Sequence, residues 1–153
     1  MKKIFAWFVL MGVIVLGVNA QSGDGSRAAV KDQDLVILIR DISSTAQFYP
    51  VDIEGTRIEV LAVKAPDGTI RTAFNTCQSC YASGRGYYKQ KGTNLVCQNC
   101  GKRFRLSQVE ISAGGCNPVP IFPADKTVDA EKIVISKDYL KQAKGIFARW
   151  KRG

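Results

Sequence analysis

Two C-x-x-C pairs constrain this chain more than any other feature of its sequence. Cys77 and Cys80 form the first pair, and sixteen residues separate it from Cys97 and Cys100 of the second. Cys116 follows, so all five cysteines lie within forty residues, and the chain has no histidine. Two short C-x-x-C loops at this separation predict one four-thiolate metal site, because each loop presents two sulfurs on one side of a tight turn.

Four thiolates suit several metals, and the spacing does not choose among them. Zinc in a closed site is the common structural use, and iron, as a single ion or an iron–sulfur cluster, adds redox chemistry. Zinc and copper stay open as alternatives. Glycine-rich loops beside the cysteines favour iron, because free backbone amides can hydrogen-bond to sulfur and tune a reduction potential. These glycines are Gly84, Gly86, Gly101, Gly114 and Gly115.

Cys116 lies in the rigid sequence Gly-Gly-Cys-Asn-Pro and has three interpretations. It is a fifth candidate ligand, a thiol that exchanges with a partner, or a small buried residue in an irregular lid. The candidate metal ligands are therefore Cys77, Cys80, Cys97, Cys100 and Cys116.

The N-terminus predicts export. Residues 1–20 combine a basic start, an apolar run of about fifteen residues and small residues at Val18-Asn19-Ala20, which is typical of a secretory signal peptide. An uncleaved membrane anchor is the alternative, although the run falls short of the ~20 residues that span a bilayer. Residues 21–34 are expected to form a flexible tether.

Export and composition limit the classes of function. Thiols oxidise outside the cytoplasm, so disulfide or dithiol chemistry is the alternative to a metal, but five cysteines cannot all pair internally. The full chain carries a formal charge of +9, which suits an anionic membrane surface or an acidic redox partner. Nucleic acid is not expected as a ligand of an exported protein. The absence of histidine and of a phosphate loop argues against hydrolytic catalysis.

Alternating apolar residues and turn signals predict a mainly β (α+β) domain over residues 35–136, a small antiparallel fold. Strands are expected at 35–39, 46–53, 57–64, 69–74 and 133–135, and Pro66-Asp67-Gly68 predicts a tight hairpin turn. The strand at 57–64 is expected to bury one face, and Pro50 to mark an edge or a bulge. The hairpin ends next to Cys77, so the C-x-x-C knuckles are predicted at loop tips of a rigid β scaffold.

Residues 137–153 predict a basic amphipathic helix. Ser136 is a candidate N-cap, and Leu140, Ala143, Phe147 and Trp150 recur at steps of three and four residues. The apolar stripe is expected to pack on the domain, with a helix lying on a membrane as the alternative.

Several short motifs around the cysteines occur together. They are Gly68-Thr69-Ile70-Arg71, Asn75-x-Cys77-x-x-Cys80-Tyr81, Gly86-Tyr87, Cys97-x-x-Cys100-Gly101-x-x-Phe104 and Gly114-Gly115-Cys116-Asn117-Pro118-x-Pro120. In this combination the stretch from Phe48 to Ile135 resembles the iron–sulfur-containing domain of the FtrD-like membrane protein family. The resemblance implies an exported, membrane-associated protein encoded with bacterial iron-uptake machinery, with membrane iron-transport or redox components as partners.

The layout is also similar, more loosely, to Rieske-type domains, which use two cysteines and two histidines. Because this chain lacks histidine, every ligand would be a cysteine, and a lower reduction potential would be expected. Three hypotheses follow: an electron-transfer or metal-handling protein for iron uptake, a thiol–disulfide oxidoreductase, and a zinc-binding interaction module.

Overall fold

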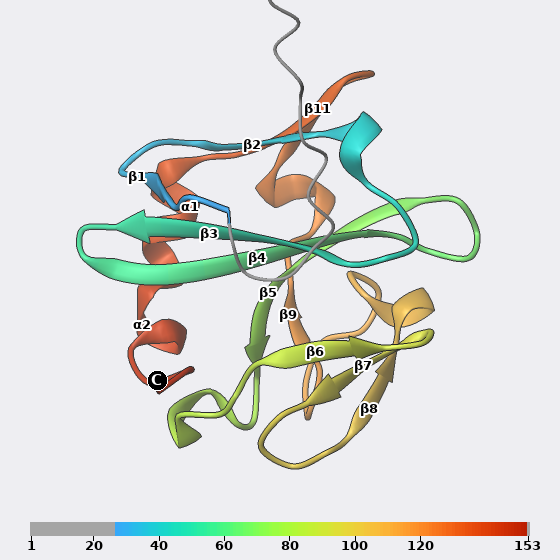
Figure 1. The fold of residues 1–153 in the computed structure, drawn as a ribbon. Coiled ribbons are helices and arrows are strands. Elements are labelled where there is room, and N and C mark those ends of the chain that lie inside the picture. Colours follow the sequence, from blue (N-terminus) through green and yellow to red (C-terminus); the bar gives the residue numbers. More distant parts are fainter. Residues whose placement is uncertain (1–26, 153) are drawn as a thin grey trace, which may run out of the picture.

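A computed structural model describes residues 27–152 and shows a mainly β domain with two short helices (Figure 1). The predicted fold class is confirmed. The predicted signal peptide, residues 1–20, lies outside the described residues. Among residues 27–152, no helix is both long enough and apolar enough to cross a bilayer.

The strands form three small sheets. The five-stranded sheet has the order β1 (Val30–Lys31), β3 (Gln47–Ile53), β4 (Thr56–Lys64), β5 (Ile70–Cys77) and β9 (Pro118–Pro120). A second sheet has the order β10 (Thr127–Val128), β11 (Lys132–Ile135) and β2 (Leu35–Leu38), and a third has the order β6 (Tyr88–Lys91), β7 (Asn94–Cys97) and β8 (Arg103–Arg105). We call the first the scaffold sheet and the third the knuckle sheet, because the knuckle sheet carries the second C-x-x-C loop.

The strand β4 is buried on both faces, whereas the sequence predicts one buried face. Ile58 and Val60 belong to the main core, which the second sheet and the helices cover. Leu61 and Val63, on the opposite face, join a second core that also contains buried residues of the knuckle sheet. Two layers therefore pack on the scaffold sheet, a consequence of long-range packing that the local alternation does not express.

The segment predicted as an irregular lid ends in a strand. Pro118–Pro120 forms β9, which pairs antiparallel with β5 at the edge of the scaffold sheet. An edge strand tolerates proline because one of its sides needs no ladder hydrogen bonds. The strand places the Cys116 loop beside the end of β5.

The chain before residue 35 is not entirely a tether. Val30 and Lys31 form β1, which pairs parallel with Val51 and Asp52 of β3. Because β1 covers only this part of β3, Pro50 faces no partner strand on that side, which fits the predicted edge position.

The predicted C-terminal helix is two short helices, α1 (Lys137–Gln142) and α2 (Lys144–Phe147). The Ser136 side chain accepts a hydrogen bond from the Tyr139 amide, as expected of an N-cap. The apolar stripe is buried in the main core, so the prediction that it packs on the domain is confirmed. After α2 the chain turns away, and Lys151 forms an isolated bridge with Arg85.

Candidate metal centre

The first knuckle is an extension of the scaffold sheet. Strand β5 ends at Cys77, whose amide donates to the Gly86 carbonyl at 2.7 Å. A Cβ added to Gly86 would lie 2.4 Å from the Cys80 carbonyl oxygen, so no other residue fits there without movement of the knuckle. The close approach of Gly86 therefore fixes the loop that carries Cys77 and Cys80.

The second knuckle connects two strands of the knuckle sheet. Strand β7 ends at Cys97, and the Gly101 amide donates to the Cys97 carbonyl at 2.9 Å. Gly101 has a φ of 71°, a conformation that glycine adopts without strain. The turn leaves Cys100 exposed at its tip, whereas Cys97 is buried.

The sulfurs of the two knuckles are held in the same manner. Backbone hydrogen bonding by Ser79 and Cys80 acts to lower the pKa of Cys77, and backbone hydrogen bonding by Asn99 and Cys100, at the same offsets, acts to lower the pKa of Cys97. Amide donors at a thiolate stabilise its negative charge and tune a bound metal.

The Cys116 loop is tied to the first knuckle through Gln78. The Gly114 amide donates to the Gln78 side-chain oxygen at 2.5 Å, and the Gln78 amide donates to the Asn117 carbonyl at 3.1 Å. The Asn117 side chain donates in turn to the Pro118 carbonyl at 2.8 Å. These contacts hold Cys116 over the knuckles.

The fold brings all five predicted cysteines together. The sulfurs of Cys77, Cys80, Cys97 and Cys116 lie within 4.8 Å of one another. Cys116 Sγ is 3.2 Å from Cys77 Sγ and 3.0 Å from Cys100 Sγ, and all five cysteines are free thiols. A metal–sulfur bond of about 2.3 Å gives a tetrahedron with edges of about 3.8 Å, so this donor set fits a thiolate-bound metal.

The thiols differ in their readiness to ionise. Burial opposes ionisation of Cys77, but hydrogen bonds from Tyr88, Cys116 and two backbone amides outweigh it and lower its pKa. The side-chain contact with Cys116 lowers the pKa of Cys100 to about 7. Burial raises the pKa of Cys97 to about 12 and also raises the pKa values of Cys80 and Cys116. A bound cation would favour the thiolate form of these sulfurs.

A buried polar chain supports the sulfurs and was not predicted from the sequence. The Asn75 side chain donates to Glu59 Oε1 at 2.7 Å and accepts from the Tyr88 amide at 2.8 Å. Tyr88 Oη then lies 3.9 Å from Cys116 Sγ. The sequence signal for this chain is Glu59, a glutamate within the apolar strand β4. A carboxylate at such a position needs a polar partner.

A buried ion pair anchors the segment that leads to Cys116. The sequence did not predict this ion pair. Lys126 Nζ lies 2.6 Å from Glu110 Oε2, and the side chains are 4% and 10% exposed. Glu110 Oε2 also accepts from the Thr72 amide of β5 at 2.6 Å. The pairing spans distant parts of the chain and leaves no local sequence pattern.

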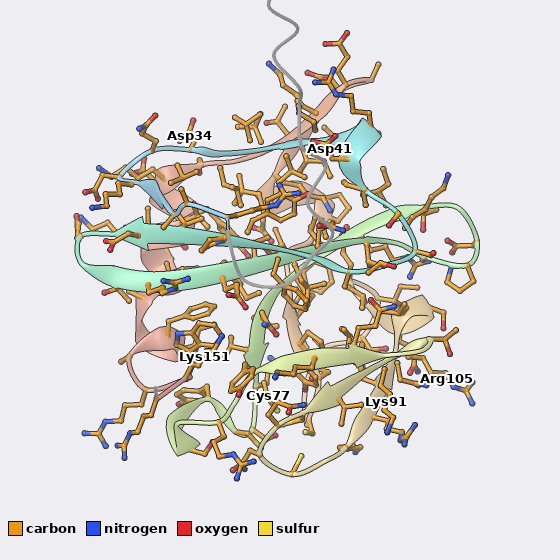
Figure 2. All side chains as sticks on the ribbon, in the orientation of Figure 1. Asp34, Asp41, Cys77, Lys91, Arg105 and Lys151 are labelled. Atoms are coloured by element: carbon orange, nitrogen blue, oxygen red, sulfur yellow. The ribbon has the colours of Figure 1, made fainter. Side chains whose placement is uncertain are left out.

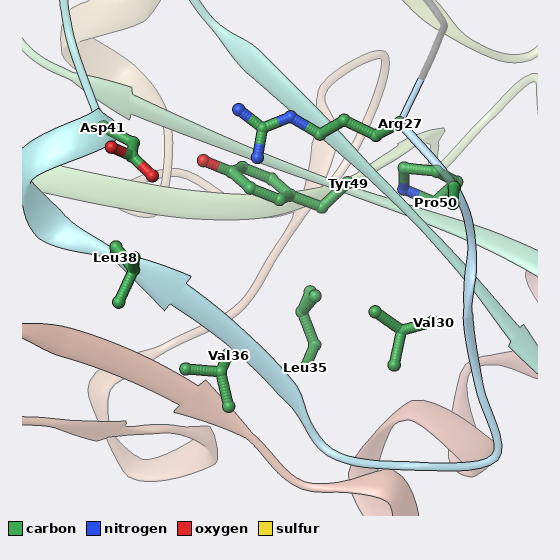
Figure 3. A pocket seen from close by; sticks show the side chains of 9 residues that line it. Arg27, Val30, Leu35, Val36, Leu38, Asp41, Tyr49 and Pro50 are labelled. Carbon is green, nitrogen blue, oxygen red and sulfur yellow. The ribbon is translucent and has the colours of Figure 1, made fainter. Parts of the chain in front are cut away.

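A cavity of about 340 Å³ lies away from the thiols, between β2 and β3 (Figure 3). Its walls are mostly apolar, and Tyr49 extends between Arg27 and Asp41. The Arg27 guanidinium sits 4.5 Å above the Tyr49 ring centroid. No cysteine lines this cavity, so the thiol cluster is a separate site.

Comparison with known proteins agrees with this site. The family model described as "Membrane iron-sulfur containing protein FtrD-like" matches residues 42–147, which include all five cysteines. No curated protein and no solved structure matches the chain, so the looser similarity to Rieske-type domains stays a prediction. The match covers more than half of the sequence, and the chain therefore belongs to the FtrD-like family of membrane iron–sulfur proteins.

Proposed function

We propose that this protein is an electron carrier whose iron–sulfur or single-iron centre is held by cysteine thiolates, in an exported system for iron uptake. The observation that carries the proposal is the group of four sulfurs within 4.8 Å of one another in a chain of an iron–sulfur family. The export and iron-uptake setting rests on the N-terminal sequence and on the family resemblance.

The ligands we propose are Cys77, Cys80, Cys97 and Cys116, with Cys100 as the fifth candidate. The doubled motif alone favours Cys100 as the fourth ligand, but the sulfur distances favour Cys116. Cys100 is the exposed member of the cluster, and it lies 3.0 Å from Cys116. It would therefore form the solvent-facing edge of the centre.

The bound iron would supply one-electron chemistry, and the chain's own groups would set its conditions. Burial of Cys77 and Cys97 keeps water from the inner side of the site, and the amides at their sulfurs disperse thiolate charge. The Asn75–Glu59 pair holds Tyr88 beside Cys116, so the surrounding polar groups need little rearrangement when the charge of the centre changes.

Metal and sulfide analysis tests this function. We expect protein purified without oxygen to contain iron, to absorb visible light, and to change its electron paramagnetic resonance spectrum after dithionite reduction. Acid-labile sulfide distinguishes a cluster from a single iron ion. Colourless protein that contains zinc alone would refute electron transfer and support an interaction module.

A thiol–disulfide oxidoreductase is the second candidate, favoured by the exposed Cys100 with its pKa lowered to about 7 by Cys116. Thiol counts with and without a reductant separate the two functions: an oxidoreductase gains thiols on reduction even when it contains no metal.

A further inference from the structure

The outer face of the knuckle sheet concentrates positive charge. In the strand register Lys89 and Arg103 both lie beside Val96, and Lys91 and Arg105 both lie beside Asn94. Side chains alternate between the two faces of a strand, so these four cations share one face while Leu95 and Cys97 point to the other. We call Lys89, Lys91, Arg103 and Arg105 the basic face.

No acidic side chain of the described residues neutralises the charge of the basic face. All four side chains are exposed, and none takes part in an ion pair within residues 27–152. The sequence from Cys77 to Val109 contains no aspartate or glutamate. Cations elsewhere do find acidic partners, as Lys141 and Lys144 do with Glu54.

Such a cluster opposes folding. Lys89 and Arg103 lie two strand spacings apart, about 10 Å, and Lys89 and Lys91 are about 7 Å apart along one strand. Like charges at these distances repel each other and destabilise the sheet. An external anion would relieve that repulsion.

The end of the basic face that Lys89 and Arg103 form is adjacent to the thiol cluster, because both lie beside Val96, the neighbour of Cys97. Cys97 ends β7, Arg103 begins β8, and the turn between these strands carries the exposed Cys100. Figure 2 shows Lys91 and Arg105 on the same part of the molecule as Cys77, whereas Asp34 and Asp41 lie at the opposite end. A partner held on this face would therefore lie next to the solvent-facing edge of the centre.

We propose that the basic face docks a redox protein with a carboxylate-rich surface, which exchanges electrons with the centre; this partner assignment rests on the proposed function. Arginine binds carboxylates through two parallel hydrogen bonds, and Arg103 and Arg105 provide two such groups. Opposite charges also speed the encounter of redox partners.

The chemistry of the face favours a protein over a lipid surface. Surfaces that bind membranes combine cations with apolar side chains that enter the headgroup layer. The large exposed apolar side chains of the described residues all lie elsewhere. They are Val36, Tyr81, Ile111, Phe122 and Val128.

The test compares two charge-matched variants of the full-length, metal-loaded protein. One carries Lys89→Gln, Lys91→Gln, Arg103→Gln and Arg105→Gln. The control carries the same change at four exposed cations of other strands that form no ion pair in the described residues: Lys31→Gln, Arg57→Gln, Lys64→Gln and Lys132→Gln. The probes are poly-L-glutamate, as a carboxylate surface, and phosphatidylcholine vesicles that contain phosphatidylserine.

We expect the basic-face variant to bind poly-L-glutamate about tenfold more weakly than the control does, because it loses four charge contacts. The difference should shrink as salt rises. Equal losses in both variants would overturn the proposal, since net charge alone would then explain binding. A larger loss on vesicles than on poly-L-glutamate would also overturn it, by assigning the face to lipid headgroups.

Neither binding measurement needs redox activity. Iron analysis of the same samples therefore separates the two ideas. Protein without iron that still shows the variant difference refutes the electron carrier alone, and iron-loaded protein without the difference refutes the docking face alone.

Discussion

The scaffold sheet and the knuckle sheet differ in size and in how their faces are packed. The scaffold sheet has five strands, with apolar residues packed on both faces of β4. The knuckle sheet has three short strands, buries one face around Tyr88 and Leu95, and exposes four cations on the other. A small sheet with one apolar face is near the lower limit of independent stability.

This difference shows that the two C-x-x-C knuckles rest on unequal supports: Cys77 ends a strand of the scaffold sheet, whereas Cys97 ends a strand of the small knuckle sheet. The knuckle sheet carries two of the thiols but depends on the scaffold, on polar anchors and, in our proposal, on the metal. Perturbing each support separately should therefore affect the two sheets unequally.

Loss of a proposed buried ligand is the largest expected perturbation. In Cys97→Ser we expect nearly complete loss of bound iron, because the oxygen is a poorer ligand for iron than a thiolate. Amide hydrogen exchange should accelerate in β6–β8 and remain slow in β3–β5. Cys100→Ser is the comparison, and we expect it to retain more iron than Cys97→Ser does. Equal iron loss in both variants would contradict the proposed ligand set.

Breaking the buried ion pair should be nearly as damaging. Lys126→Met leaves the Glu110 carboxylate buried without its cation, and we expect a loss of about 3–5 kcal/mol in the free energy of unfolding. Urea denaturation measures it, with Lys132→Met as the control, because Lys132 is exposed and forms no ion pair within residues 27–152. Adding Glu110→Gln to Lys126→Met should restore part of the lost free energy of unfolding, since the glutamine amide carries no charge.

A truncation in the main core separates stability from metal binding. Leu140 is fully buried in the main core, so Leu140→Ala should lower the free energy of unfolding by about 2–5 kcal/mol. Iron content at low temperature should not change, because the residue belongs to the core on the other side of the scaffold sheet from Cys77 and Cys97. Iron loss from folded Leu140→Ala protein would show that the two regions are one cooperative unit.

A methyl group at Gly86 tests the junction between the regions. Its Cβ would lie 2.4 Å from the Cys80 carbonyl oxygen. We expect Gly86→Ala to lower the free energy of unfolding by about 1–3 kcal/mol. We also expect the variant to lose iron to a chelator faster than the wild type does. Gly145→Ala adds the same group where nothing lies within 4 Å. We expect this control to retain iron against the chelator as well as the wild type does.

The smallest expected effect is a change in stability at low pH. Hydrogen bonds from Lys141 and Lys144 lower the pKa of Glu54 to about 2, from 4.5. A lowered pKa adds stability above pH 4.5 that is lost as the pH falls toward 2. The difference in urea midpoint between wild type and Glu54→Gln should therefore shrink over this range. It should also shrink in high salt, because these groups are exposed.

Local patterns in the sequence predicted the parts of the site that neighbours in the chain determine. The strand ending at Cys77, the turn at Pro66-Asp67-Gly68 and the cysteine set all follow from short motifs, and the structure contains the strand, the turn and the clustered thiols. The ligand assignment itself stays a prediction.

The features that the sequence did not predict depend on contacts between residues far apart in the chain. Leu61 is buried because the knuckle sheet packs on β4, and the Lys126–Glu110 pair forms only after β5 and the Cys116 loop meet. The Ser136 cap and the apolar periodicity after it predicted a continuous C-terminal helix, but the chain after Phe147 turns to pair Lys151 with Arg85. Local periodicity cannot express such pairings.

The two hydrogen bonds of Gln78 would affect the lifetime of the proposed centre. If Cys116 is a ligand, its loop must swing outward before iron can leave, and the Gln78 contacts to Gly114 and Asn117 must break first. A residue that offers no ligand atom would thus slow metal exchange. In surroundings rich in iron chelators, such a kinetic barrier would protect the proposed centre independently of its affinity for iron.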